Sequence, residues 1–263
     1  MNKNNTLFCL FCGLLVFKVF SNDSIRPSIH EGENALEKLY SYNILREGDP
    51  VRLHLGCGQN HFDGYVNIDY SPAEHTVQAK IGADVFADIA YLNFPENSVD
   101  EIRSHHVFEH FDRGAALGLL CKWHRWLKVG GKLIIETPDF DGCVRFYMNP
   151  RNSYTKKQAV IRHLFGSHEA RWAVHCDGWY KEKFERVLNT LGFRDISSRL
   201  YHYATVLYNI TVTAYKKESI NDMRLRQLAG NILNDSQIGK GGKKIMEVWL
   251  GIFDQVFIKQ KFV

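Results

Sequence analysis

The chain has 263 residues, of which 45% are hydrophobic and 24% are charged, as in an ordinary globular protein. This length is enough for one large hydrophobic core plus an appendage. The formal net charge of +4 is small, and no long run of lysine or arginine is present. These properties exclude a strongly basic, phosphate-tracking surface, so we do not expect nucleic acid as a partner.

The cysteines are scattered along the chain and show no paired spacing. A chain of this size does not need disulfide staples, so we expect reduced thiols. Cys9 and Cys12 form a C-x-x-C motif inside an apolar run. No strand–helix–strand pattern flanks it, so we do not expect redox or metal chemistry there.

The N-terminal segment is apolar from Thr6 to Phe20 and follows Lys3. It is too short for a comfortable membrane span. Three interpretations stay open: a signal peptide with a cleavage site near Val19–Ser21, a membrane-anchoring helix, and a docking helix. Lys18 within the apolar run counts against the signal peptide. Residues 1–22 are therefore treated as a separate segment.

Strand and helix patterns alternate from Val51 onward, which is typical of a mostly parallel sheet with crossover helices. A helix is expected earlier, around residues 34–45. The expected strands are 51–55, 65–68, 83–86, 99–104, 132–136, 194–199 and 205–215. Helices are expected over 108–127, ending at the glycines of 128–131, and over 181–191.

The most informative motif is Leu53–Gly58, a buried strand that runs into a glycine turn. A second strand follows and ends in Asp69. Two glycines let the backbone turn tightly and approach a ligand closely. An ionised carboxylate can accept hydrogen bonds from both hydroxyls of a ribose. The pattern predicts a nucleotide-like cofactor at the carboxyl edge of an open α/β sheet.

Three blocks, 53–70, 87–111 and 123–140, together with a helix ending at 189–193, resemble the class I S-adenosylmethionine-dependent methyltransferases. More narrowly, they resemble the small bacterial type-11-like enzymes associated with surface-glycan genes. The resemblance spans roughly residues 50–216. It implies an α/β, doubly wound, seven-stranded, mostly parallel Rossmann-like sheet with an antiparallel end. We divide the chain into the apolar segment 1–22, a methyltransferase domain 48–216 and a helical C-terminal extension 217–263.

The resemblance implies S-adenosylmethionine as cofactor. The residues implied to contact it are Leu55, Gly56, Cys57, Gly58, Asp69, Tyr70, Asp88, Ile89, His105 and His106. Asp69 would hold the ribose, Asp88 with the Ile89 backbone would meet the adenine, and the two histidines would face the methionine end. Only ten residues separate Gly58 from Asp69, so the usual first crossover helix must be short or replaced by a loop.

The acceptor site is expected in the segment His163–Tyr180, where the family places its acceptor pocket. This segment is rich in histidine and tryptophan, which suit the apolar face and hydroxyl rim of a sugar. His175 is the candidate base for a hydroxyl proton. Asp139, after the fifth expected strand, is a second catalytic candidate, but it could equally cap the next helix.

The expected reaction is O-methylation of a sugar or glycan precursor. The alternatives are another small-molecule or lipid-linked acceptor, and a degenerate module that binds the cofactor without catalysis. His106–His110 also matches H-x-x-E-H, the inverted zinc-protease motif. Because this motif directly follows a strand, only Glu109 and His110 are expected to be helical. We therefore expect no metal.

The C-terminal extension carries an apolar stripe between Ile245 and Phe257, edged by lysines. Such a stripe suits peripheral contact with an anionic membrane or a partner, and packing back onto the domain is the alternative. We expect a cytoplasmic protein, with or without membrane association, because the methyl donor is made inside cells. Nothing in the sequence specifies an oligomeric state.

Overall fold

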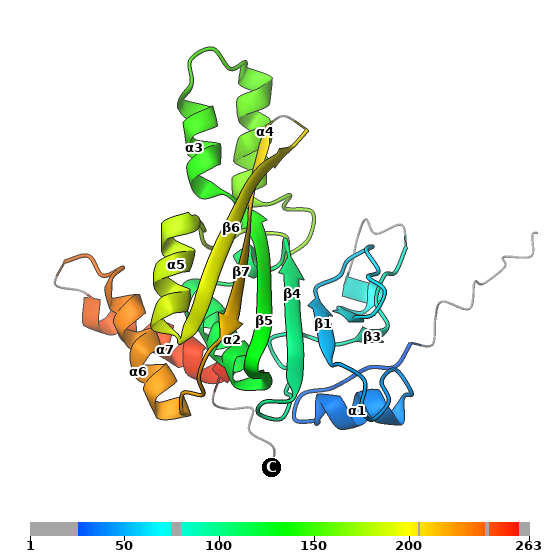
Figure 1. Ribbon diagram of the computed structural model, residues 1–263. Coiled ribbons are helices and arrows are strands. Elements are labelled where there is room, and N and C mark those ends of the chain that lie inside the picture. Colours follow the sequence, from blue (N-terminus) through cyan, green and yellow to red (C-terminus); the bar gives the residue numbers. More distant parts are fainter. Residues whose placement is uncertain (1–25, 75–79, 205, 240–241, 258–263) are drawn as a thin grey trace, which may run out of the picture.

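The computed structural model describes residues 26–74, 80–204, 206–239 and 242–257. A seven-stranded sheet in the order β3-β2-β1-β4-β5-β7-β6 forms its centre (Figure 1). The strands are β1 Arg52–Leu55, β2 Val66–Asp69, β3 Val85–Phe86, β4 Val99–His105, β5 Leu127–Pro138, β6 Phe193–Tyr203 and β7 Leu207–Lys216. Neighbours from β3 to β5 are parallel, and β7 is antiparallel to β5 and β6. The predicted fold class is confirmed.

The helices are α1 Ala35–Ser41, α2 Arg113–Trp126, α3 Phe140–Met148, α4 Tyr154–Phe165, α5 Lys181–Thr190, α6 Asp222–Asn234 and α7 Gly242–Phe257. Two short 3-10 turns, η1 Pro72–Glu74 and η2 Phe108–His110, complete the set in the described ranges. The connection between β1 and β2 is an irregular loop, as its length predicted. This loop contains the glycine turn.

The predicted helix 108–127 begins later than expected. Asp112 is its N-cap, and its side chain accepts hydrogen bonds from the backbone N–H groups of Gly114 and Ala115, at 2.9 and 3.0 Å. The residues before it form η2 instead. At the other end, Leu127 already pairs with Val99, so β5 starts before the glycines that the sequence suggested as a helix stop. The Asp112 cap and the pairing of Leu127 with Val99 set these two ends, and the hydrophobic periodicity of the sequence carries no information on either.

Two helices, α3 and α4, were not expected from the sequence. They form a hairpin that stands beyond the carboxyl ends of β4 and β5 (Figure 1). Asp139 caps α3 and Ser153 caps α4 through side-chain bonds to backbone N–H groups. The hairpin thereby places the end of α4, and the loop after it, over the edge of the sheet where ligands bind.

Helix α2 is buried on nearly all sides because α7 covers the face that the sheet leaves free. The two helices approach closely at two glycines. A β-carbon on Gly114 would lie 2.5 Å from the Trp249 carbonyl oxygen, and one on Gly118 would lie 2.9 Å from Val256 Cβ. Phe253 of α7 is fully buried at this contact. This close approach explains why α2 has glycine at positions 114 and 118.

The apolar stripe of the C-terminal extension therefore packs back onto the domain over most of its length. This is the second of the two alternatives that the sequence left open. Ile245, at the start of the stripe, stays 46% exposed. The other apolar segment, Thr6–Phe20, lies outside the described residues, as do Cys9 and Cys12. None of the helices in the described ranges has the length and apolar character needed to cross a membrane.

Candidate functional site

A cavity of about 370 Å³ opens at the carboxyl ends of β1, β2 and β4. Of the predicted cofactor residues, those on its wall are Gly56, Cys57, Gly58, Asp69, Tyr70, Ile89, His105 and His106. Leu55 and Asp88 are not. Leu55 is fully buried within the sheet. The wall also contains Val107, Phe111, Arg171 and Trp172, which the sequence did not suggest as cofactor contacts.

The glycine turn has a conformation that other residues rarely adopt. Gly56 and Gly58 have φ angles of +69° and +57°. The N–H groups of Gly56 and Cys57 both donate to the Ile68 carbonyl oxygen, at 2.8 and 3.1 Å, which fixes the turn against β2. A β-carbon on Gly56 would lie 2.2 Å from Val107 Cγ2. Val107 thus packs against Gly56 so closely that any larger residue would clash with it.

Asp69 stands at the end of β2, on the cavity wall. Its Oδ2 accepts a hydrogen bond from the Gly58 N–H, and its Oδ1 accepts one from the Tyr70 N–H at 2.7 Å. Each carboxylate oxygen has further acceptor capacity, so the group could also hold the hydroxyls of a ribose. The same side chain therefore closes the glycine turn and presents acceptors to the cavity.

Asp88 lies behind the cavity wall. Its Oδ1 accepts from the Ala90 N–H at 2.9 Å, and its carboxylate also bonds with the Tyr70 hydroxyl. Burial raises the pKa of Asp88, although these two hydrogen bonds act in the opposite direction. These local bonds use part of the acceptor capacity of the carboxylate, and the adenine contact of Asp88 stays a prediction. Ile89 does line the cavity, and its backbone could meet the adenine.

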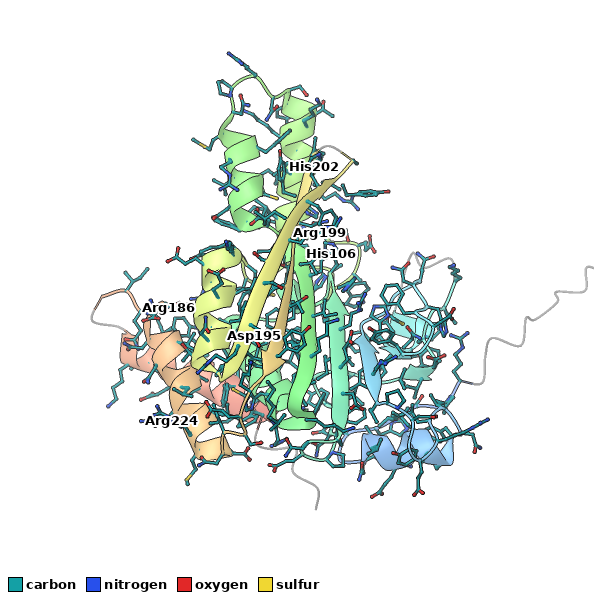
Figure 2. The ribbon with its side chains drawn as sticks, viewed as in Figure 1. His106, Arg186, Asp195, Arg199, His202 and Arg224 are labelled. Carbon is teal, nitrogen blue, oxygen red and sulfur yellow. The ribbon has the colours of Figure 1, made fainter. Side chains whose placement is uncertain are left out.

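His105 and His106 end β4 and differ in charge. Burial lowers the pKa of His105 to about 4, so its imidazole is neutral near pH 7. His106 has a left-handed φ of +54° and lies at the carboxyl end of the central strands (Figure 2). Its Nδ1 is 3.3 Å from Glu109 Oε1, and its Nε2 is 3.4 Å from Glu136 Oε1. Burial opposes charging, but the two carboxylates outweigh it and raise the pKa of His106 to about 10.

Glu136 is a buried part of this network that sequence reasoning missed. Tyr201 Oη donates to its Oε1 and Thr211 Oγ1 to its Oε2, both at 2.6 Å. Although burial acts in the opposite direction, hydrogen bonds from His106, Thr211 and Tyr201 lower the pKa of Glu136 to about 2. The available signal was an acid at the end of the apolar strand segment 133–135.

Comparison with known proteins agrees with this geometry. Residues 53–135 match the family described as Methyltransferase domain. The match spans the glycine turn, Asp69 and both histidines at the end of β4. This part of the chain is a methyltransferase domain. The cavity fits S-adenosylmethionine as cofactor, since the glycine turn lines it beside Asp69, whose carboxylate offers acceptors for hydroxyl groups. No curated protein matches the chain.

Two solved structures illustrate what the methyltransferase is similar to. An S-adenosylmethionine-dependent methyltransferase from Archaeoglobus fulgidus is 16% identical, with a TM-score of 0.40, and the match covers 68% of this chain and 92% of the other. The 1,6-didemethyltoxoflavin-N1-methyltransferase of Burkholderia thailandensis, which binds S-adenosylhomocysteine, is 14% identical, with a TM-score of 0.42 and coverage of 69% and 76%.

A second cavity, of about 480 Å³, lies beside the first in the methyltransferase. It is formed by η2, α4, the loop that follows α4, and the turn between β6 and β7. His106, His110 and Trp172 line both cavities. The two spaces therefore meet at these three side chains.

His163 and His175 line the second cavity, as expected of an acceptor segment. His163 Nε2 lies 3.1 Å from the Tyr208 carbonyl oxygen and 2.9 Å from Asn209 Oδ1. His175 Nε2 lies 3.9 Å from Glu109 Oε1. Burial lowers the pKa of His175 to about 4. The structure thus brings His175 next to an acid that lies 66 positions away in the sequence.

Two further residues of the segment His163–Tyr180, and Asp139, lie away from the second cavity. Trp179 is buried in the core, with its ring centroid 4.8 Å from that of Phe108. His168 is exposed and interacts with the carbonyl of its own turn. Asp139 is 3% exposed and lines neither cavity, and its Oδ2 accepts from the Gly142 N–H at 2.9 Å. Asp139 therefore caps α3, the alternative that the sequence left open, and its catalytic role stays an untested prediction.

The H-x-x-E-H motif does not form the arrangement of an inverted zinc protease. The left-handed turn at His106 and the 3-10 turn after it separate His106 from His110, and His106 pairs with carboxylates instead. A different set of possible metal ligands lies close together in the structure. Ligand atoms of Glu109, His110 and His175 all lie within 4.8 Å of one another.

Proposed function

We propose that this enzyme transfers the methyl group of S-adenosylmethionine to a hydroxyl oxygen of a sugar or glycan precursor. The observation that carries the proposal is the wall of His106, His110 and Trp172, which the cofactor cavity shares with the second cavity. A methyl group presented from the first space would reach an acceptor held in the second. This junction lies at the carboxyl edge of the sheet, where open α/β sheets bind ligands.

The reaction is an in-line displacement at the methyl carbon. The acceptor oxygen forms a bond to that carbon while the carbon–sulfur bond breaks, and the electron pair stays on sulfur as S-adenosylhomocysteine. The hydroxyl proton leaves the acceptor. Positioning provides much of the acceleration in such a reaction. The glycine turn and Asp69 would hold the cofactor, and the shared wall would orient the acceptor.

The second cavity has the chemistry that a hydroxylated ring requires. Trp172 offers an aromatic face, and His163, His175 and Arg162 offer polar groups around it. Rings with an apolar face and a hydroxyl rim bind to such mixtures of aromatic and polar side chains. We propose that His175 takes part in activating the acceptor hydroxyl, as a base when no other group does so, because it lines this cavity and lies close to Glu109.

The test is methyl transfer from a labelled donor to a panel of sugar nucleotides, glycan fragments, amines and thiols. Mass spectrometry and NMR of the product identify the methylated atom. We expect an O-methylated, hydroxylated ring as product, and much less product with Asp69→Ala when the donor is kept near the concentration that half-saturates the wild type. A His202→Ala variant, altered at an exposed histidine on β6 (Figure 2), serves as control. Transfer only to nitrogen or sulfur acceptors would overturn the proposal.

A further inference from the structure

The group formed by Glu109, His110 and His175 has the composition of a metal site. Glu109 and His110 come from η2, and His175 comes from the loop after α4. Their ligand atoms lie within 4.8 Å of one another. Two imidazoles and one carboxylate form the ligand set of open, three-residue zinc sites and of other first-row divalent metals. The cluster does not include His106, so it differs from the H-x-x-E-H motif in the sequence.

One oxygen of the Glu109 carboxylate is buried without a hydrogen-bond partner. Its side chain is only 2% exposed. Oε1 faces His106, but Oε2 is buried without a hydrogen-bond partner, and so is Nδ1 of His175. An unsatisfied polar atom of a buried charged group is costly. Oε1 also lies 3.9 Å from His175 Nε2, so a cation held by this carboxylate and the imidazoles would add the partner that the buried group lacks.

Backbone bonds hold the ligands in place. His110 Nδ1 lies 3.1 Å from the Val174 carbonyl oxygen. A histidine that donates one ring N–H to a carbonyl keeps the lone pair of its other nitrogen for a metal. The Cys176 N–H donates to the Glu109 carbonyl oxygen at 2.8 Å, and the His175 N–H donates to that of Phe165 at 3.1 Å. The first bond ties the loop with His175 directly to η2, and the second ties it to the end of α4.

We propose that Glu109, His110 and His175 bind one divalent metal ion of the zinc type and leave its remaining coordination position open to the second cavity. Zinc bonds of about 2 Å place tetrahedral ligand atoms about 3.4 Å apart. The side chains must therefore close by roughly 1–1.5 Å, which small side-chain rotations supply. All three residues line the second cavity, so the open position faces the proposed acceptor.

This proposal goes beyond the methyl transfer itself. An ion in this position could bind an acceptor hydroxyl and lower its pKa as a Lewis acid. His175 would then be a ligand, and the ion would take over the activation of the hydroxyl. Metal binding can be measured without any acceptor, so its failure is distinguishable from a failure of the proposed reaction.

The experiment titrates ZnCl2 into the full chain, stripped of metal and free of a histidine tag, by calorimetry. Absorption spectra with Co²⁺ report the coordination geometry. We expect one equivalent of metal to bind. Because even outer-shell partners change metal affinity by about 10–100-fold, Glu109→Gln, His110→Ala and His175→Ala should each weaken binding by more than about tenfold. His202→Ala, and a Cys9→Ser/Cys12→Ser variant, should bind as the wild type does.

His175→Phe provides a second variant that keeps a ring of similar volume without a lone pair. Circular dichroism and S-adenosylhomocysteine binding check that each variant is folded. The proposal is overturned if the folded wild type binds no Zn²⁺, or if folded Glu109→Gln and His175→Phe variants bind it as tightly as the wild type. It is also overturned if the Cys9→Ser/Cys12→Ser variant loses the metal.

Discussion

Gly56 and Val107 are packed against each other at the floor of the cofactor cavity. A β-carbon on Gly56 would lie 2.2 Å from Cγ2 and 2.9 Å from Cγ1 of Val107. Gly56 follows β1, and Val107 follows the two histidines that end β4. The contact therefore couples the glycine turn to the position of His105 and His106, on the opposite side of the same cavity.

Replacement of Gly56 by alanine should damage this cavity. The left-handed conformation costs an L-residue about 1–2 kcal/mol, and overpacking adds about 1–3 kcal/mol. We expect Gly56→Ala to lower the melting temperature and to weaken S-adenosylhomocysteine binding in calorimetry. Gly56→Ala/Val107→Ala should recover part of the stability, since it removes the clash and keeps the backbone strain. If Gly56→Ala binds with wild-type affinity, the coupling is wrong.

Asp69 should be required for cofactor affinity. Its carboxylate lines the cavity and also accepts the Gly58 N–H. We expect Asp69→Ala to weaken S-adenosylhomocysteine binding by about 1.5–3 kcal/mol, the range for hydrogen bonds to a charged group. Calorimetry measures this, and circular dichroism verifies the fold. Asp63→Ala, a change at a fully exposed acid in the same loop, is the matched control. An unchanged affinity in folded Asp69→Ala would remove the ribose assignment.

His124 should make the enzyme sensitive to mild acid. Burial lowers the pKa of His124 from 6.5 to about 4. Between these values the unfolded chain binds a proton that the folded chain does not, so the free energy of unfolding falls as pH falls from 6.5 towards 4. We expect a loss of roughly 1–3 kcal/mol across this window. Below the folded-state pKa the contribution levels off.

Urea unfolding of wild type and His124→Leu, at about pH 7.5 and about pH 5, tests this. The stability difference between the two proteins should shift in favour of His124→Leu at the lower pH, because leucine does not titrate. The other titrating groups are the same in both proteins, so their contributions to the pH dependence cancel in the difference. Equal pH dependence would show that His124 is not the titrating group.

Asp139 should contribute to stability rather than to catalysis. It caps α3 by accepting the Gly142 N–H, and it lines neither cavity. We expect Asp139→Ala to cost about 0.5–2 kcal/mol of stability, whereas Asp139→Asn, which can still cap, should cost less. Thermal unfolding measures both. Methyl transfer by the folded variants should stay near the wild-type rate, and a large loss at full folding would support the catalytic prediction.

The sequence predicted local features of this site well and its long-range contacts poorly. The glycine turn and Asp69 lie within one short strand–turn–strand unit, so spacing alone placed them together. Asp139 was ambiguous because a helix cap and a catalytic acid occupy the same position after a strand. The approach of His175 to Glu109 depends on the α3–α4 hairpin and on the bond from the Cys176 N–H to the Glu109 carbonyl oxygen. Neither has a periodic signal in the sequence.

His175 should affect methyl transfer and leave cofactor affinity nearly intact. It lines the second cavity, whereas Gly58 and Asp69 line the first. If His175 accepts the hydroxyl proton, His175→Ala should lower kcat by about 10²–10⁴-fold. Steady-state kinetics with the acceptor found in the screen, and calorimetry with S-adenosylhomocysteine, separate the two effects. His168→Ala, an exposed histidine of the same loop, is the control. A loss of only a few-fold would mean that His175 merely lines the pocket, and a parallel loss of cofactor binding would move it to the cofactor site.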